Sequence, residues 1–192
     1  MSSGLKKFLR PSDRAIGVVV ALALFVVLTA TDFARQQADF TIARGRVGSL
    51  KLGMTADEVV ALFGQQRVRQ VDLRLEGMRS PALEISLGDP SVSRPALTAE
   101  FLPSAENRIF RVTVFDRRFR TADGLGVGST LGQIRTHHHV RMLVGDGNVV
   151  AHVQELQLSF DFGSRWFPSV HLPASAPVES VLVLWPPEEV PK

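Results

Sequence analysis

A single apolar segment constrains this chain more than any other feature. Residues 15–31 read AIGVVVALALFVVLTAT, seventeen residues without a charge, between Arg14 and Asp32. As a helix this segment would extend about 26 Å, which is at the lower limit for crossing a hydrocarbon core of about 30 Å. We therefore expect a transmembrane helix over residues 15–31.

The basic residues that flank this segment predict its orientation. They are Lys6, Lys7, Arg10 and Arg14, and all of them precede it. Because positive charge stays on the cytoplasmic side, residues 1–14 form a cytoplasmic tail and residues 32–192 are exported. We therefore expect a single-pass protein of the cytoplasmic (inner) membrane, with its N-terminus inside and a periplasmic or other extracytoplasmic C-terminal domain.

A cleaved signal peptide is the main alternative to this membrane anchor. Signal peptides have apolar regions of about 7 to 15 residues and end in an A-x-A-like site. Here the run is longer, and Leu28-Thr29-Ala30 has a leucine where a small residue is expected. We favour an uncleaved signal anchor, and cleavage stays open.

Charge and cysteine content exclude several classes of function. The pI of 9.9 comes from the N-terminal tail, since 18 basic and 18 acidic residues follow residue 14. A nucleic-acid-binding surface would need basic excess on the folded part, so we expect no nucleic-acid partner. The absence of cysteine excludes disulfides, a lipoprotein-type anchor, thiolate catalysis and cysteine-based metal sites.

The chain contains two similar segments at a constant offset of 75 residues, 50–59 and 125–134, with the shared pattern L-x-[LV]-G-x-T-x-x-[EQ]-[VI]. The threonine and the acidic or amide residue three positions later form a capping box, Thr55 with Glu58 and Thr130 with Gln133. This pattern predicts short helices over residues 56–63 and 131–138.

Short runs with strand character follow each predicted helix, separated by Gly, Pro, Asp and Asn. They cover residues 68–75, 83–87, 97–102, 109–115, 140–144, 149–153, 156–162 and 181–184. Residues 145–148, Gly-Asp-Gly-Asn, predict a hairpin turn.

One helix followed by about four antiparallel strands, twice over, predicts an α+β fold of two tandem repeats. The predicted organisation after the membrane segment is a stalk over residues 32–46, a first repeat over 47–120 and a second over 121–185. A disordered tail over 186–192 completes the chain.

The segment GMTADEVVALFG at residues 53–64, with its weaker echo GSTLGQIRTHHH at 128–139, resembles the tandem modules of β-lactamase-inhibitory-protein-like folds. The first segment is also similar to the single module of the small outer-membrane assembly lipoproteins. The resemblance covers roughly residues 46–185 and implies an α+β fold that binds other proteins outside the cytoplasm. It assigns no site residues, and this chain lacks the lipoprotein cysteine.

Histidines are the candidate metal ligands, because imidazole binds zinc, copper and nickel. His137 and His139 belong to a triplet, and His152 follows later in the chain. The repeat offset places the triplet at the end of the second helix, where cationic side chains favour the helix dipole. This structural interpretation is favoured, and we expect no bound metal or cofactor.

Arginines and phenylalanines alternate over residues 108–120. Phe110, Val112 and Val114 would share one face of a half-buried strand. The remaining charge gathers in a loop of four residues, Arg117, Arg118, Phe119 and Arg120. This loop is either solvated charge, which we favour, or a docking patch for an anionic partner.

The sequence contains no catalytic pattern. The glycine-rich run at 124–130 lacks the lysine of a phosphate-binding loop, and no G-x-S-x-G occurs. We therefore expect a non-enzymatic, membrane-anchored extracytoplasmic interaction protein of inhibitor, scaffold or tether type, whose partner is an envelope protein. The alternative is an envelope protein that binds a small ligand or a metal.

Overall fold

The described residues belong to one compact unit that begins at Asp39, which we call the folded part. The structure, a computed structural model, describes residues 39–75, 78–88, 94–102, 108–145 and 147–185. The predicted membrane segment at 15–31, the basic tail before it and the C-terminal tail at 186–192 lie outside these residues. Across the described part of the chain, no helix has both the length and the apolar character needed to span a membrane.

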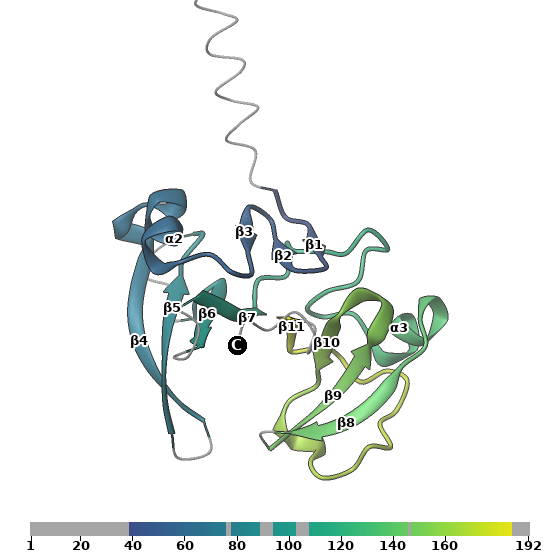
Figure 1. The fold of residues 1–192 in the computed structure, drawn as a ribbon. Coiled ribbons are helices and arrows are strands. Elements are labelled where there is room, and N and C mark those ends of the chain that lie inside the picture. Colours follow the sequence, from purple (N-terminus) through teal and green to yellow (C-terminus); the bar gives the residue numbers. More distant parts are fainter. Residues whose placement is uncertain (1–38, 76–77, 89–93, 103–107, 146, 186–192) are drawn as a thin grey trace, which may run out of the picture. The chain divides into compact units, whose positions relative to one another are not determined.

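A continuous antiparallel sheet of eight strands forms the body of the described chain, in the order β4-β5-β6-β7-β11-β10-β9-β8 (Figure 1). Its strands are β4 (Val68–Leu75), β5 (Met78–Ile85), β6 (Leu97–Leu102), β7 (Arg108–Val114), β8 (Arg141–Gly145), β9 (Asn148–Val153), β10 (Leu158–Asp161) and β11 (Ser180–Leu184). A small sheet contains β1 (Ile42–Ala43), β2 (Arg46–Val47) and β3 (Leu50–Lys51). The helices are α2 (Ala56–Phe63), α3 (Leu131–His137) and the short 3₁₀ helices η1 (Gln65–Arg67), η2 (Gln154–Leu156) and η3 (Ser164–Trp166).

This architecture confirms the mixed α+β class, with two α-helices and mostly antiparallel strands in the described residues. In chain order, α2 is followed by β4 to β7 and α3 is followed by β8 to β11.

Both α-helices begin at the predicted capping boxes. The Thr55 backbone N–H donates to Glu58 Oε2 at 2.8 Å, and the Thr55 hydroxyl accepts from the Glu58 N–H. Thr130 and Gln133 make the same reciprocal contacts. Because each box satisfies N–H groups that lack a helical partner, it determines where the helix starts.

The predicted strands are present, and so is the hairpin turn, where Gly145 pairs with Asn148. The largest difference is β5, which begins at Met78 instead of residue 83. Pro81 interrupts the sequence signal, because proline cannot donate to a strand ladder. It is tolerated here because β6 pairs with β5 only from Ala82 onward.

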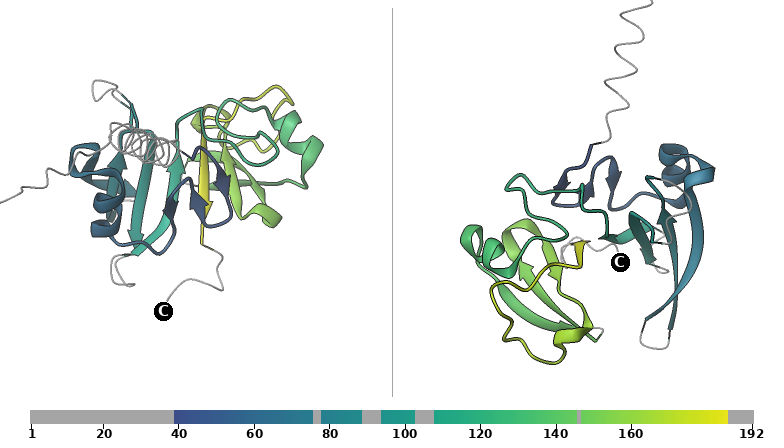
Figure 2. Two further views of the ribbon diagram at one scale, coloured as in Figure 1. Left: turned by 90° about the horizontal axis from the view of Figure 1, so that it is seen from above. Right: turned by 180° about the vertical axis from the view of Figure 1, so that it is seen from behind.

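The two four-stranded halves join where β7 pairs with β11. Val112 lies opposite Val183 and Val114 lies opposite Val181, and all four side chains are fully buried. The helices and the small sheet lie on one face of the large sheet (Figures 1 and 2). Val59 of α2, Ile134 of α3 and Leu50 of β3 therefore belong to the same buried cluster as the valines of the joint.

Residues 39–46, which the sequence analysis assigned to a stalk over residues 32–46, belong to the folded part. Ile42 is 2% exposed, and its backbone N–H donates to the Arg120 carbonyl at 2.7 Å. Arg120 in turn donates its backbone N–H to the carbonyl of Phe40. β1 pairs with the neighbouring β2, but strands of two residues have no periodic sequence pattern, and the additional contact with Arg120 lies far along the chain. Local sequence patterns therefore predict neither the short strands nor this contact.

Because one core lies under both halves, we expect a single cooperative unfolding transition. Leu97→Ala in β6 and Leu158→Ala in β10 remove fully buried side chains. Each should lower the free energy of unfolding by about 2–5 kcal/mol and shift the same transition. Chemical unfolding of the full-length chain, followed by circular dichroism and tryptophan fluorescence, measures this.

Leu62→Ala is the matched control, because Leu62 is 41% exposed. Its effect should stay within about 0.5 kcal/mol. Two separate transitions, each moved by only one of the core substitutions, would contradict a shared core.

Candidate functional site

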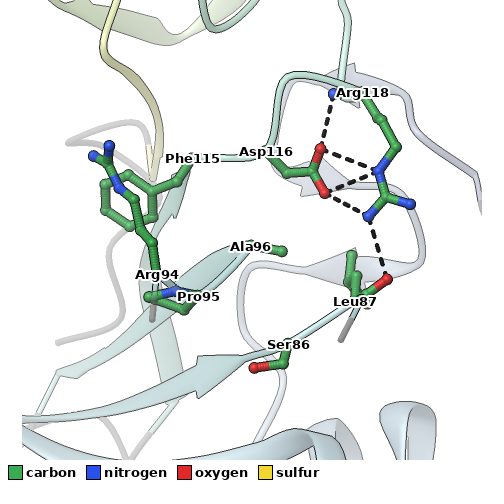
Figure 3. Close-up of a pocket in the computed structure, with 9 residues that line it drawn as sticks. Ser86, Leu87, Arg94, Pro95, Ala96, Phe115, Asp116 and Arg118 are labelled. Carbon is green, nitrogen blue, oxygen red and sulfur yellow. Dashed lines mark hydrogen bonds and ion pairs between the residues drawn. The ribbon is translucent and has the colours of Figure 1, made fainter. Parts of the chain in front are cut away.

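A pocket of about 270 Å³ opens at one end of the eight-stranded sheet, where β5 ends, β6 begins and β7 ends (Figure 3). Its lining consists of Ser86, Leu87, Gly88, Arg94, Pro95, Ala96, Phe115, Asp116 and Arg118. Antiparallel pairing brings these three strand ends together, and the backbone N–H groups of Phe115 and Asp116 both donate to the Ala96 carbonyl. The pocket therefore has a rigid floor.

One side of the pocket is an arginine stacked on an aromatic ring. The Arg94 guanidinium carbon lies 4.3 Å from the centre of the Phe115 ring. Arg94 is exposed and Phe115 is half-buried. A cation over a ring face is attracted to the ring quadrupole, so this contact limits the mobility of the arginine side chain.

The other side of the pocket is an ion pair between Asp116 and Arg118. Arg118 Nε lies 3.0 Å from Asp116 Oδ2, and the Arg118 backbone N–H donates to Oδ1 at 2.9 Å. The same guanidinium donates to the Leu87 carbonyl at 3.2 Å and lies over the ring of Phe40. The hydrogen bonds from Arg118 hold the pKa of the Asp116 carboxyl below its ordinary value, against the opposing effect of burial.

Size and charge limit what this pocket can hold. Sites for small molecules and cofactors usually have volumes of about 300–1,000 Å³, and this pocket is below that range. Its lining has two arginines and one aspartate, and its floor is mostly apolar. The pocket therefore suits a single side chain with negative charge better than a cofactor.

The loop predicted as a possible docking patch contributes one residue, Arg118, to this pocket. Phe119 is 2% exposed and packs edge-on against Phe40, with ring centres 5.0 Å apart. Arg120 donates from Nη1 to the Val127 carbonyl at 2.9 Å. Arg117 is exposed and does not line the pocket.

The three candidate metal ligands occupy different places. His137 is the last residue of α3, and His137 and His139 are both exposed. His152 lies on β9, where its Nδ1 is 3.1 Å from the hydroxyl of Ser159. In the part of the chain that the structure describes, no three His, Asp or Glu residues are grouped so that they could hold a metal ion.

The middle histidine of the triplet makes contacts that the sequence did not indicate. His138 caps the C-terminus of α3, and its side chain is 10% exposed. Its Nε2 lies 3.1 Å from Asp123 Oδ2, and its Nδ1 lies 2.9 Å from Glu155 Oε1. Because the two nitrogens face carboxylates on different segments, His138 connects the end of α3 to η2 and to the loop before the helix.

The sheet face opposite the helices carries polar pairs between neighbouring strands. Arg111 binds Glu100 through two hydrogen bonds, although the Glu100 side chain is only 3% exposed. His152 lies on this same face, beside Arg141 of β8. Burial lowers the pKa of His152, and the positive charge of Arg141 lowers it further.

Sequence reasoning missed Arg94, Phe115 and Leu87 as members of one site. They belong to three different strand ends, and only the pairing of β5, β6 and β7 brings them together. No local motif marks them.

The chain is similar to a solved structure. The crystal structure of the uncharacterized protein yfeY from Escherichia coli aligns with 76% of this chain and 98% of its own, at 16% identity and a TM-score of 0.49. No protein-family model matches the chain. A search of curated proteins also gives no match.

The ion pair of the pocket should make the free energy of unfolding depend on pH in the acid range. Because the pKa of Asp116 is lowered in the folded state, the unfolded chain takes up that proton first as the pH falls. Asp116 therefore contributes stability above about pH 4, and this contribution is lost below that pH. Asp116→Asn should be less stable than wild type at pH 7, and the difference should shrink at pH 3. An equal difference at both pH values would contradict this.

His152 should make the free energy of unfolding depend on pH over a higher range than Asp116 does. Because its folded-state pKa lies below 6.5, the unfolded chain binds a proton there first, and stability falls as the pH drops from about 6.5. In His152→Gln this loss of stability should be absent when the free energy of unfolding is measured between pH 7.5 and about pH 5. His171→Gln, which removes an exposed loop histidine, is the control. An unchanged pH dependence in His152→Gln would contradict the assignment.

Proposed function

We propose that this protein is a membrane-anchored, extracytoplasmic interaction protein that binds a partner protein of the cell envelope and inhibits, supports or tethers it. The observation that carries this proposal is the contact of Arg94 with Phe115 beside a pocket of about 270 Å³, just under the usual size of a small-molecule site. Arginine and phenylalanine are enriched at protein interfaces relative to the rest of the surface. The function proposed is binding and not catalysis.

We further propose that the folded part is an internal duplication, α2 with β4 to β7 and α3 with β8 to β11. The sequence offset of 75 residues supports this. The segments that precede the two helices also make similar backbone hydrogen bonds. The segment before α2 bonds to β7 through Gly53 N–H and the Ile109 carbonyl, at 2.8 Å. The segment before α3 bonds to the approach of β11 through Gly128 N–H and the Val178 carbonyl, also at 2.8 Å. The resemblance to tandem inhibitory folds is consistent with a binding role.

The proposed anchor limits where such a partner can be. If residues 15–31 cross the membrane, residues 32–38 connect them to the folded part at Asp39. Seven residues of extended chain reach at most about 25 Å, so the folded part stays close to the bilayer. The expected partner is therefore a membrane protein or a soluble protein that approaches the periplasmic surface of the membrane.

The test is photocrosslinking in cells with the full-length chain. A photoreactive amino acid at Gly88 would line the pocket, and a Cβ atom at this position meets no atom within 4 Å. Gly145 is the matched control, because it also has open space but lies at the far end of β8. We expect one abundant partner adduct from position 88 and none from position 145. Equal adducts from both positions, or none from either, would contradict the proposal.

A further inference from the structure

We propose that the pocket is a receptor for a carboxylate of the partner protein, held by Arg94, with the apolar stem of that acidic residue against Phe115 and Ala96. This inference rests on the proposed function and adds the chemistry of the group that is recognised. Three features of the pocket support it.

The first feature is the position of Arg94. Its guanidinium carbon lies 4.3 Å from the centre of the Phe115 ring, so the ring restricts the side chain while the N–H donors of the guanidinium can still bind an anion. A planar fork of donors binds a carboxylate through two parallel hydrogen bonds. Because the ring already orders the side chain, less entropy is lost when the anion binds.

The second feature is the separation of the two arginines. Figure 3 shows Arg94 along Phe115 on one side of the pocket and the Asp116–Arg118 pair on the other, with Ala96 between them. Arg118 binds Asp116 through its side chain and its backbone, so the carboxylate of the pocket is already bound. Among the described residues of the lining, no second carboxylate is left to pair with Arg94, so its charge is available to a ligand.

The third feature is the match in charge and size. Among the described residues that line the pocket, two arginines and one aspartate leave one net positive charge, which matches the single charge of a carboxylate. A phosphate group carries close to two negative charges at neutral pH and would be matched less well. The volume of about 270 Å³ and the apolar floor suit a glutamate, an aspartate or a chain terminus with its adjoining carbon atoms.

Binding of simple probes to the full-length chain in zwitterionic detergent tests the chemistry. Hexanoate supplies a carboxylate on an apolar stem, hexanol supplies the stem alone, and hexyl phosphate supplies the competing anion. We expect hexanoate to shift the NMR signals of the Arg94 Nε–H and the Phe115 ring in a saturable way. Hexanol should not shift the Arg94 signal, and hexyl phosphate should bind no more tightly than hexanoate.

Two variants assign the binding to Arg94. Arg94→Gln should weaken hexanoate binding about tenfold or more, since it removes a charged donor pair. Arg117→Gln is the matched control, because it removes one exposed positive charge nearby without changing the lining of the pocket. It should bind hexanoate as wild type does. Equal loss in both variants, no saturable shift, or clearly tighter binding of hexyl phosphate would overturn the carboxylate assignment.

The crosslinking experiment separates this inference from the proposed function. If the adduct at position 88 forms in wild type and is lost in Arg94→Gln but not in Arg117→Gln, both stand. If the adduct persists in Arg94→Gln, the interaction role stands and the carboxylate receptor is overturned. If hexanoate binds at Arg94 but no adduct forms in wild type, the anion site stands and the interaction role fails.

Discussion

The pairing of β7 with β11 is the interaction on which the described structure depends. Each half of the chain has four strands, and without this pairing each would end in an unprotected apolar edge. The backbone pairing of β7 with β11 removes both edges and makes one sheet of eight strands, and Val112, Val114, Val181 and Val183 are fully buried on its core face. The helices and the small sheet then cover a single core. The same pairing holds β7 in place between β6 and β11, and β7 carries Phe115 to the end of the sheet where the pocket forms.

Features that depend on neighbouring residues could be predicted from the sequence. The capping boxes at Thr55 and Thr130 involve residues three positions apart, and both helices begin where these boxes indicate. Most strand positions followed from alternating patterns and turn residues in the same way. Strand partners could not be predicted, because the joint between β7 and β11 connects residues about 70 positions apart. The small sheet was missed because a strand of two residues has no period to detect.

In the candidate site, too, local features could be predicted from the sequence and contacts between distant segments could not. The triplet at 137–139 was correctly assigned to the end of the second helix, because the offset of 75 residues aligns it with residues 62–64, where the first helix ends. The contacts of His138 with Asp123 and Glu155 could not be predicted, since they need the loop before α3 and the turn after β9 to lie beside it. The stacking of Arg94 on Phe115 is equally non-local. A sequence shows arginines and aromatic residues but not which arginine meets which ring.

The distribution of charge explains why a single arginine at the pocket is more informative about binding than the net charge of the folded part. Basic and acidic residues balance after residue 14, and many arginines are used internally. Arg46 binds Asp39, Arg111 binds Glu100 and Arg118 binds Asp116. An arginine ordered by a carboxylate has its charge neutralised by the contact that orders it, whereas Arg94 is ordered by a ring and keeps its charge. On a surface whose charges balance, such a group at the rim of a pocket would favour an anion in that pocket, which adds selectivity for position to selectivity for charge.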